Sequence, residues 1–168
     1  MQKPSFVYVS YIHTTPEKLW AALTQPEFTR KYWFDCGIES DWKVGSPVRF
    51  RRDGELAMDQ VLLECTPPRR LAYTWSMCGD AEAKSERPSR VTFELEPVGD
   101  QAGASAPVVK LTVTHDDFPA GSVVFPRISQ GWPVVLSNLK TLLESGQPMV
   151  TTWESCAATT KDEAVVAA

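Results

Sequence analysis

Hydrophobic positions near the C-terminus recur at helical spacing. They fall three, four or one residue apart between 125 and 143, which places them on one broad apolar stripe. We therefore predict an amphipathic helix over residues 131–146 that another layer must cover. Pro133 is expected to kink it or to mark a change of direction around Gly131, and Gly146 to cap its end in the left-handed conformation. The stripe consists of Phe125, Ile128, Trp132, Val135, Leu136, Leu139, Leu142 and Leu143.

Short segments with the composition of β-strands precede this helix. Residues 6–12 are rich in Val and Tyr and predict a first strand. The segment Thr14-Thr15-Pro16-Glu17 then supplies a helix start, and a second short helix follows Pro26. Because short turns such as Asp53-Gly54 join the later strands, we expect antiparallel hairpins arranged as a meander. These strands are predicted near residues 38–43, 47–52, 58–65, 70–77, 90–96 and 108–115.

Three polar or small-residue segments are predicted to lie outside this framework. Residues 79–89 are expected to form a loop, and residues 99–107 a mobile hairpin tip. Beyond Gly146 the chain carries few large apolar groups, and Trp153 is the residue expected to dock if any does. We therefore predict one domain over residues 1–146 and a weakly ordered tail over residues 147–168.

Composition narrows the class of protein. A chain of 168 residues with 43% hydrophobic content can bury the core of one domain. The net charge is −4 and the basic residues are scattered, so we expect no nucleic-acid partner. The N-terminal residues lack a continuous apolar run and no segment approaches the ~20 apolar residues of a membrane span, so neither a signal peptide nor membrane insertion is expected. A soluble cytoplasmic protein is the expectation.

The residues that commonly carry metals or catalysis are sparse. Four cysteines show no C-x-x-C spacing and only two histidines are present, so we predict reduced thiols, no metal site and no cofactor. The sequence contains no G-x-S-x-G, no G-x-x-x-x-G-K-[ST] and no H-E-x-x-H pattern, which removes common signatures of hydrolases, nucleotide-binding proteins and metalloproteases. No catalytic residue is assigned on these grounds.

Strand alternation assigns the inner face of the predicted sheet. Residues two apart point to the same side of a strand, so the apolar set of residues 90–96 faces the core and its polar set faces solvent. The same parity turns His115 and Trp75 inward on the neighbouring strands, and these two should form a transverse row with Val91. The residues predicted to face inward are Leu71, Tyr73, Trp75, Val91, Phe93, Leu95, Val109, Leu111, Val113 and His115.

The order of elements and six sequence segments resemble one known family. A strand, two short helices, a run of antiparallel strands and a long terminal helix is the layout of the START-like helix-grip fold. Over residues 6–146 the sequence is similar to the family named after the activator of the heat-shock-protein-ninety ATPase. The segments that carry the resemblance are Thr15 to Thr24, Val44-Gly45, Pro67 to Trp75, Arg90 to Leu95, Leu111 to His115 and Gly131 to Glu144.

The resemblance implies an α+β fold in which a curved antiparallel sheet of about seven strands wraps around the C-terminal helix. It also implies a lipophilic cavity between sheet and helix, which the superfamily uses to hold lipids, hormones or polyketides. Eight residues are candidates for contact with a ligand in such a cavity, with His115 and Tyr73 as its polar anchors. They are Trp20, Trp33, Tyr73, Trp75, Phe93, His115, Phe118 and Trp132.

Three functions are compatible with these expectations. The first is binding of a small hydrophobic or aromatic molecule in the cavity, whose apolar walls and few polar anchors fit such a ligand. The second is a protein-interaction role, such as stimulating a chaperone ATPase, which the resemblance alone implies. The third is an enzyme of the cyclase or hydratase type that uses His115 as acid and base. For each aromatic candidate, the alternative to ligand contact is simple packing in the core. For His115, the alternative to an anchor or an acid and base is a buried histidine whose hydrogen bonds are satisfied by neighbouring groups.

Overall fold

The computed structural model describes residues 3–77, 81–99 and 107–149. Within these ranges seven strands form one antiparallel sheet in the order β1-β7-β6-β5-β4-β3-β2. Strands β2 to β7 pair in sequence order, which confirms the predicted meander, and β1 lies beside β7 at the opposite edge. The strands are β1 (Phe6–His13), β2 (Gly37–Ser40), β3 (Pro47–Arg52), β4 (Glu55–Thr66), β5 (Arg70–Trp75), β6 (Ser89–Val98) and β7 (Val108–Asp116).

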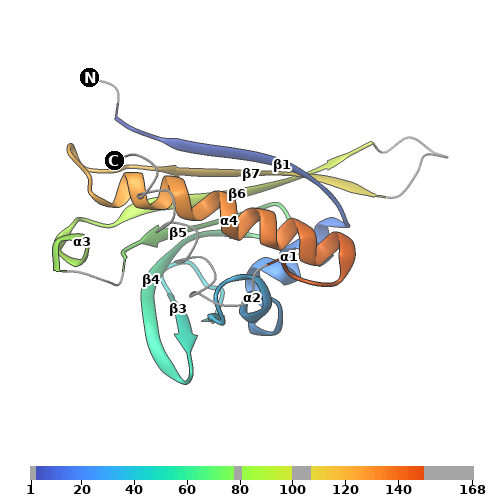
Figure 1. The fold of residues 1–168 in the computed structure, drawn as a ribbon, viewed down its shortest axis with the longest axis horizontal. Helices are drawn as coiled ribbons and strands as arrows, with labels where there is room; N and C mark the ends of the chain where they lie inside the picture. Colours follow the sequence, from blue (N-terminus) through green and yellow to red (C-terminus); the bar gives the residue numbers. More distant parts are fainter. Residues whose placement is uncertain (1–2, 78–80, 100–106, 150–168) are drawn as a thin grey trace, which may run out of the picture.

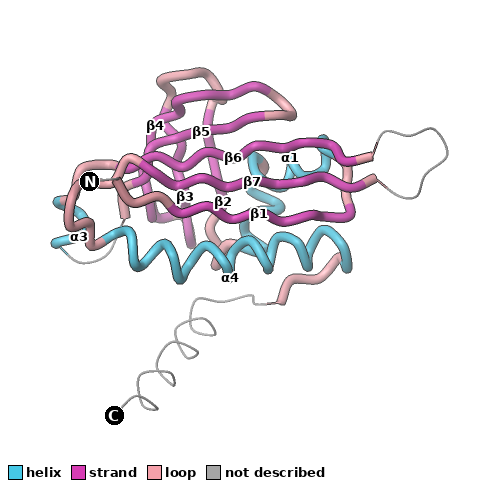
Figure 2. Tube along the Cα trace, turned by 90° about the horizontal axis from the view of Figure 1, so that it is seen from above, coloured by secondary structure: helices cyan, strands magenta, loops and turns pink. Residues whose placement is uncertain are grey.

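Helices cover one side of this sheet. The long helix α4 (Val124–Ser145) lies lengthwise against the sheet, and from above it runs alongside β1 (Figures 1 and 2). The short helices α1 (Pro16–Thr24) and α2 (Pro26–Tyr32) follow β1, as predicted, and lie toward the C-terminal end of α4 (Figure 1). A curved sheet with a long C-terminal helix confirms the predicted helix-grip fold.

Helix α4 begins earlier and runs more continuously than the sequence suggests. It starts at Val124 rather than at residue 131 and passes through Gly131 and Pro133 as one helix (Figure 1). Proline removes one backbone donor inside a helix, but the buried apolar stripe continues on both sides of it. Gly146 caps the helix with a φ of 80°, as predicted, and its N–H donates to the Leu142 carbonyl at 2.9 Å.

The N-terminus of α4 is held by a carboxylate from another part of the chain. One oxygen of Glu86 accepts hydrogen bonds from the backbone N–H groups of Val123 and Val124, at 2.8 and 3.3 Å. The other oxygen accepts from the Ser122 hydroxyl. Free N–H groups and the helix dipole make this end of a helix favourable for a negative charge. Glu86 therefore ties the start of α4 to the segment before β6.

Replacing Glu86 with alanine is expected to lower the free energy of unfolding by about 1–2 kcal/mol, because the first turn of α4 loses its acceptor. Urea denaturation measures this loss. Glu82→Ala is the matched control, since it removes the same charge from an exposed position on the nearby helix α3 (Ala81–Ser85). Equal losses in the two variants would show that Glu86 does not act as a cap.

Several boundaries differ from the sequence prediction. The segment over residues 79–89 was predicted to be a loop but contains α3. Its residue Ala83 is buried against the core, a tertiary contact that the polar composition of the segment does not indicate. Strand β2 ends at Ser40, and β4 extends beyond the predicted residues 58–65 at both ends. The predicted tip over residues 99–107 and the tail from 147 fall mostly outside the described residues, as does Trp153.

The inner face of the sheet is the predicted one. Every inward-facing residue assigned on β5, β6 and β7 is buried. The transverse row is wrong at one member, because Val91 lies between His115 and Tyr73, and Trp75 pairs with Ser89 instead. The pairing of β5 with β6 is therefore shifted by two residues from the predicted pairing of Trp75 with Val91, which assumed that the ends of the strands align.

Candidate functional site

An aromatic cluster fills the space between α4 and the sheet, and Trp132 lies at its centre. From the middle of α4, Trp132 contacts the rings of Trp33, Trp75 and Phe93 with centroid separations of 5.4, 5.2 and 5.8 Å. The rings of Trp33 and Trp75 stack on each other at 6.1 Å. Edge-to-face and offset contacts at these distances are favourable for aromatic pairs. The cluster therefore joins α4 to the end of α2 and to the sheet.

His115 is hydrogen-bonded through both ring nitrogens. The Trp132 indole N–H donates to Nδ1 at 2.9 Å, and Nε2 lies 2.8 Å from the Ser89 hydroxyl oxygen. Because Nδ1 accepts, the neutral imidazole carries its proton on Nε2 and donates it to Ser89. The Ser89 hydroxyl in turn lies 3.3 Å from the carbonyl of Trp75, to which it donates. The Phe118 ring stacks on the imidazole at 4.7 Å.

This environment keeps His115 neutral. The side chain is fully buried, and burial lowers its pKa from 6.5 to about 3. A general acid or base at neutral pH needs a pKa near 7 and an exchangeable site within reach of substrate. Both nitrogens of His115 are occupied by Ser89 and Trp132, so the arrangement matches a histidine that connects α4 to β6 and β7 by hydrogen bonds.

Stability should fall as the pH is lowered below 6.5. In that range the unfolded chain protonates His115 while the folded protein does not, because its pKa lies near 3. Lowering the pH from 8 to 5 should reduce the free energy of unfolding by about 2 kcal/mol through this residue. Urea denaturation of the wild type and His115→Gln at both pH values measures the difference. An identical pH dependence in the two proteins would contradict the assignment.

A pocket opens beside the aromatic cluster, between the N-terminal half of α4, the residues after α2, and strands β3 to β5. Its volume is about 360 Å³. The walls are apolar apart from Cys36 and two arginines, Arg52 at the end of β3 and Arg127 on α4. The lining residues are Trp33, Phe34, Cys36, Arg52, Met58, Trp75, Met77, Arg127, Ile128, Gly131, Trp132 and Val135.

The eight sequence-predicted residues divide into three groups. Trp33, Trp75 and Trp132 line the pocket. The other buried candidates lie in the core next to them, joined through ring contacts. Trp20 is only partly buried on α1 and is not among the described lining residues. The buried core candidates are Tyr73, Phe93, His115 and Phe118.

The polar groups of the pocket are not the predicted anchors. His115 and Tyr73 are buried behind the wall, and burial raises the pKa of the Tyr73 hydroxyl well above its usual value. Arg52 and Arg127 line the pocket instead. The indole N–H of Trp75 is also buried and has no acceptor among the residues that the structure describes. An unpaired buried donor of this kind costs about 1–3 kcal/mol.

Sequence reasoning missed the two arginines because it started the helix too late. Arg127, Gly131 and Val135 are four residues apart and therefore share one face of α4. This spacing indicates a shared helix face only if the helix is taken to begin at Val124, which includes Arg127 in it. Arg52 carries no comparable signal, since alternation in β3 does not show which residue lies beside α4.

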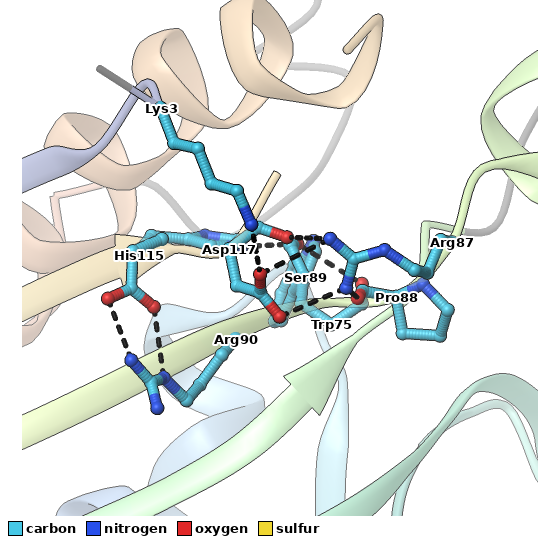
Figure 3. A network of polar contacts seen from close by, with 9 residues as sticks. Lys3, Trp75, Arg87, Pro88, Ser89, Arg90, His115 and Asp117 are labelled. Atoms are coloured by element: carbon cyan, nitrogen blue, oxygen red, sulfur yellow. Dashed lines mark hydrogen bonds and ion pairs between the residues drawn. The ribbon is translucent and has the colours of Figure 1, made fainter. Parts of the chain in front are cut away.

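The two acidic residues after His115 belong to a surface network. Asp117 lies between Lys3 and Arg87, with Arg87 Nη1 at 3.0 Å from its carboxylate (Figure 3). Arg90 makes two hydrogen bonds of 2.9 Å to Asp116. Hydrogen bonding by Arg87 lowers the pKa of Asp117. Asp117 is exposed and Asp116 is partly buried, and the carboxylate of each is paired with cations.

No group of three or more His, Cys, Asp or Glu side chains is placed to hold a metal ion in the described part of the chain. Of the helices within residues 3–77, 81–99 and 107–149, none is both long and apolar enough to cross a membrane.

The chain matches no curated protein. Among solved structures, MLL2253 from Mesorhizobium loti is 26% identical, with a TM-score of 0.66 over 83% of this chain and 96% of that one. The Aha1 dimer from Colwellia psychrerythraea is 23% identical, with a TM-score of 0.64 and coverages of 85% and 98%. PFC0360w, an HSP90 activator from Plasmodium falciparum, is 24% identical, with a TM-score of 0.63 and coverages of 83% and 95%.

A family comparison covers most of the described sequence. The model of the family described as "Activator of Hsp90 ATPase homolog 1-like protein" matches residues 13–144, from the end of β1 to the last turn of α4. This span includes the aromatic cluster and every lining residue of the pocket. The chain therefore belongs to the family of activator of Hsp90 ATPase homolog 1-like proteins.

Proposed function

We propose that this protein binds a small hydrophobic or aromatic molecule in the pocket between α4 and the sheet. The observation that carries the proposal is the wall itself, in which the indoles of Trp33, Trp75 and Trp132 meet beside a space of about 360 Å³. Pockets for small molecules occupy about 300–1,000 Å³ and have mostly apolar walls with a few polar groups.

The chemistry of the wall favours an apolar, flat or flexible ligand. Rigid indole faces offer a large contact area at low entropic cost. Met58 and Met77 line the same space, and their unbranched thioether side chains adapt to different shapes. Family membership and fold are consistent with a ligand-binding domain in general terms.

Titration with N-phenyl-1-naphthylamine, an uncharged aromatic probe that fluoresces in apolar surroundings, tests this function. We expect saturable binding of one probe molecule per chain and quenching of tryptophan fluorescence, because three indoles line the pocket. Native mass spectrometry of the purified protein should also detect a co-purified small molecule. Absence of saturable binding, together with absence of any retained molecule, would reject the proposal.

A second function deserves a direct test because the outer face of the sheet is unusually apolar at β1. Val7, Val9 and Tyr11 alternate along this strand and are each about half exposed, at 57, 48 and 54%. Exposed apolar patches often mark protein contacts. In this second proposal the patch binds a chaperone of the Hsp90 type and stimulates its ATPase, as the family description suggests. No stimulation at saturating protein, or equal stimulation by Val7→Ser/Val9→Ser, would reject it.

We also propose that the protein acts in the cytoplasm and that residues 1–146 form its single domain. Cys65 is a free thiol, which suits a reducing compartment. Fractionation of cells and limited proteolysis test these two statements. A secreted protein would contradict the first, and cleavage at a site between two separately stable parts of residues 1–146 would contradict the second.

A further inference from the structure

We propose that the chain beyond α4 places the indole of Trp153 in the mouth of the pocket, where it competes with the small molecule. The competition rests on the proposed function, whereas docking of the indole does not require it. Trp153 follows the described residues, which end at Met149, and is the one aromatic residue of the sequence after Gly146. The position of Met149 and the chemistry of the pocket wall carry this inference.

The chain turns back along α4 after the helix ends. Gly146 adopts a left-handed φ of 80°, and three residues later the Met149 N–H donates to Asn138 Oδ1 at 2.6 Å. Asn138 lies seven residues before Ser145, the last residue of α4, so the chain has returned by about 10 Å along the helix axis. Figure 2 shows the loop after α4 running back beside the helix. At Met149 the chain therefore heads toward the N-terminal half of α4, where the pocket lies.

The residue that holds Met149 is next to the pocket on both walls. Asn138 is fully buried, and its side-chain nitrogen donates to the Tyr32 carbonyl at 3.0 Å. Tyr32 directly precedes Trp33, a lining residue. On the helix, Asn138 follows the lining residue Val135 by three positions, so the two share one face of α4 and lie about one turn apart. Asn138 therefore holds the chain at the edge of the pocket.

Trp153 is close enough in sequence to reach the pocket from this point. It follows Met149 by four residues, and an extended chain spans at most about 3.3–3.6 Å per residue, or roughly 13–14 Å. The lining residue Gly131 lies seven residues before Asn138, which is about 10 Å along the axis of α4. A Cβ built on Gly131 meets no atom within 4 Å, so the helix surface leaves room there for a large side chain. The span is therefore sufficient to bring the indole over Gly131.

The pocket wall suits a further indole. Trp33, Trp75 and Trp132 line it, and aromatic rings pair favourably in edge-to-face or offset contacts. Met58 and Met77 add thioether groups, which also make favourable contacts with aromatic rings. A group held by a short tether has a high effective concentration at its site, about millimolar. An apolar ligand must therefore displace the indole to fill the mouth of the pocket.

Methionine methyl groups report this docking without any ligand. We expect the ¹³C-methyl NMR signals of Met58 or Met77 to move in Trp153→Ser, because the ring current of an indole shifts the signals of nearby methyl groups. In titrations with N-phenyl-1-naphthylamine, Trp153→Ser should bind the probe about fivefold more tightly than the wild type, because the indole no longer lowers the fraction of open pockets. Trp153→Phe keeps an aromatic ring and should have an intermediate affinity.

Thr152→Ala is the matched control. It keeps the indole and the number of residues between Met149 and Trp153, so the methyl signals and the affinity should match those of the wild type. Thermal unfolding checks that each variant is folded. Unchanged signals of both Met58 and Met77 in Trp153→Ser, equal affinity of Trp153→Ser and the wild type for the probe, or equal changes in Thr152→Ala would each overturn the inference. If the probe binds to none of these proteins, the proposed function fails, and the methyl signals alone then decide whether the indole docks.

Discussion

Replacing Trp132 with alanine is expected to lower the free energy of unfolding by about 3–5 kcal/mol, the usual range for deleting a large buried aromatic side chain. Trp132 is 3% exposed and contacts the ring of Trp33, directly after α2, and rings of the sheet. Its N–H also satisfies Nδ1 of His115, which is left as a buried unpaired acceptor in the variant. The loss is a large part of the 5–15 kcal/mol that stabilises a typical domain.

Urea denaturation measures this effect, and two further variants make it specific. Trp132→Phe keeps most of the ring packing but removes the donor to His115, so its loss should be about 1–3 kcal/mol. Trp20→Ala removes the same side chain from a partly buried position and should cost less than Trp132→Ala. A loss in Trp132→Ala no greater than that in Trp20→Ala would contradict the central place given to Trp132.

Replacing Gly131 with phenylalanine should weaken binding of N-phenyl-1-naphthylamine at least a hundredfold, because the new ring occupies the pocket. Gly131 lines the pocket on α4, and a Cβ built there meets no atom within 4 Å. The new side chain therefore enters empty space without displacing packed atoms. Phenylalanine also has a higher helix propensity than glycine, so we expect the variant to stay folded. Fluorescence titration and thermal unfolding measure the two effects.

Two neighbouring substitutions control for this change. Gly131→Ala adds only a methyl group and should raise the stability by about 1 kcal/mol while leaving most of the pocket open. Gln130→Phe places the same ring on an exposed position of the same helix and should leave the affinity unchanged. A similar loss of affinity in Gln130→Phe and Gly131→Phe would show that the probe does not enter this pocket.

The fold was predictable because its signals are local and repeated. Alternation in β5, β6 and β7 identified the buried face, and the apolar stripe of α4 identified the helix that covers it. Two errors have different causes. The helix α3 depends on a tertiary contact, the burial of Ala83, which no local pattern contains. The start of α4 was placed too late although the apolar stripe already included Phe125 and Ile128, because the capping of Val123 and Val124 by Glu86 has no local signal.

The site was predictable only in part. Aromatic residues at inward positions marked the region of the pocket, and Trp33, Trp75 and Trp132 do line it. The polar anchors could not be chosen from alternation, because an inward-facing residue can lie either at the pocket or behind its wall. His115 lies behind it, where burial and two hydrogen bonds hold it neutral. To distinguish a residue that lines the pocket from one behind its wall, the distance between α4 and the sheet must be known. That distance depends on packing across the whole core.

The methionine methyl groups offer the most direct test that a small apolar molecule occupies this pocket. The chain has four methionines, of which Met58 and Met77 line the pocket and Met149 lies elsewhere with 52% of its surface exposed. In NMR spectra of protein labelled with ¹³C at the methionine methyl groups, assigned by Met→Leu variants, N-phenyl-1-naphthylamine should shift Met58 and Met77 saturably and leave Met149 in place. Unchanged signals of Met58 and Met77 at saturating probe would contradict the account.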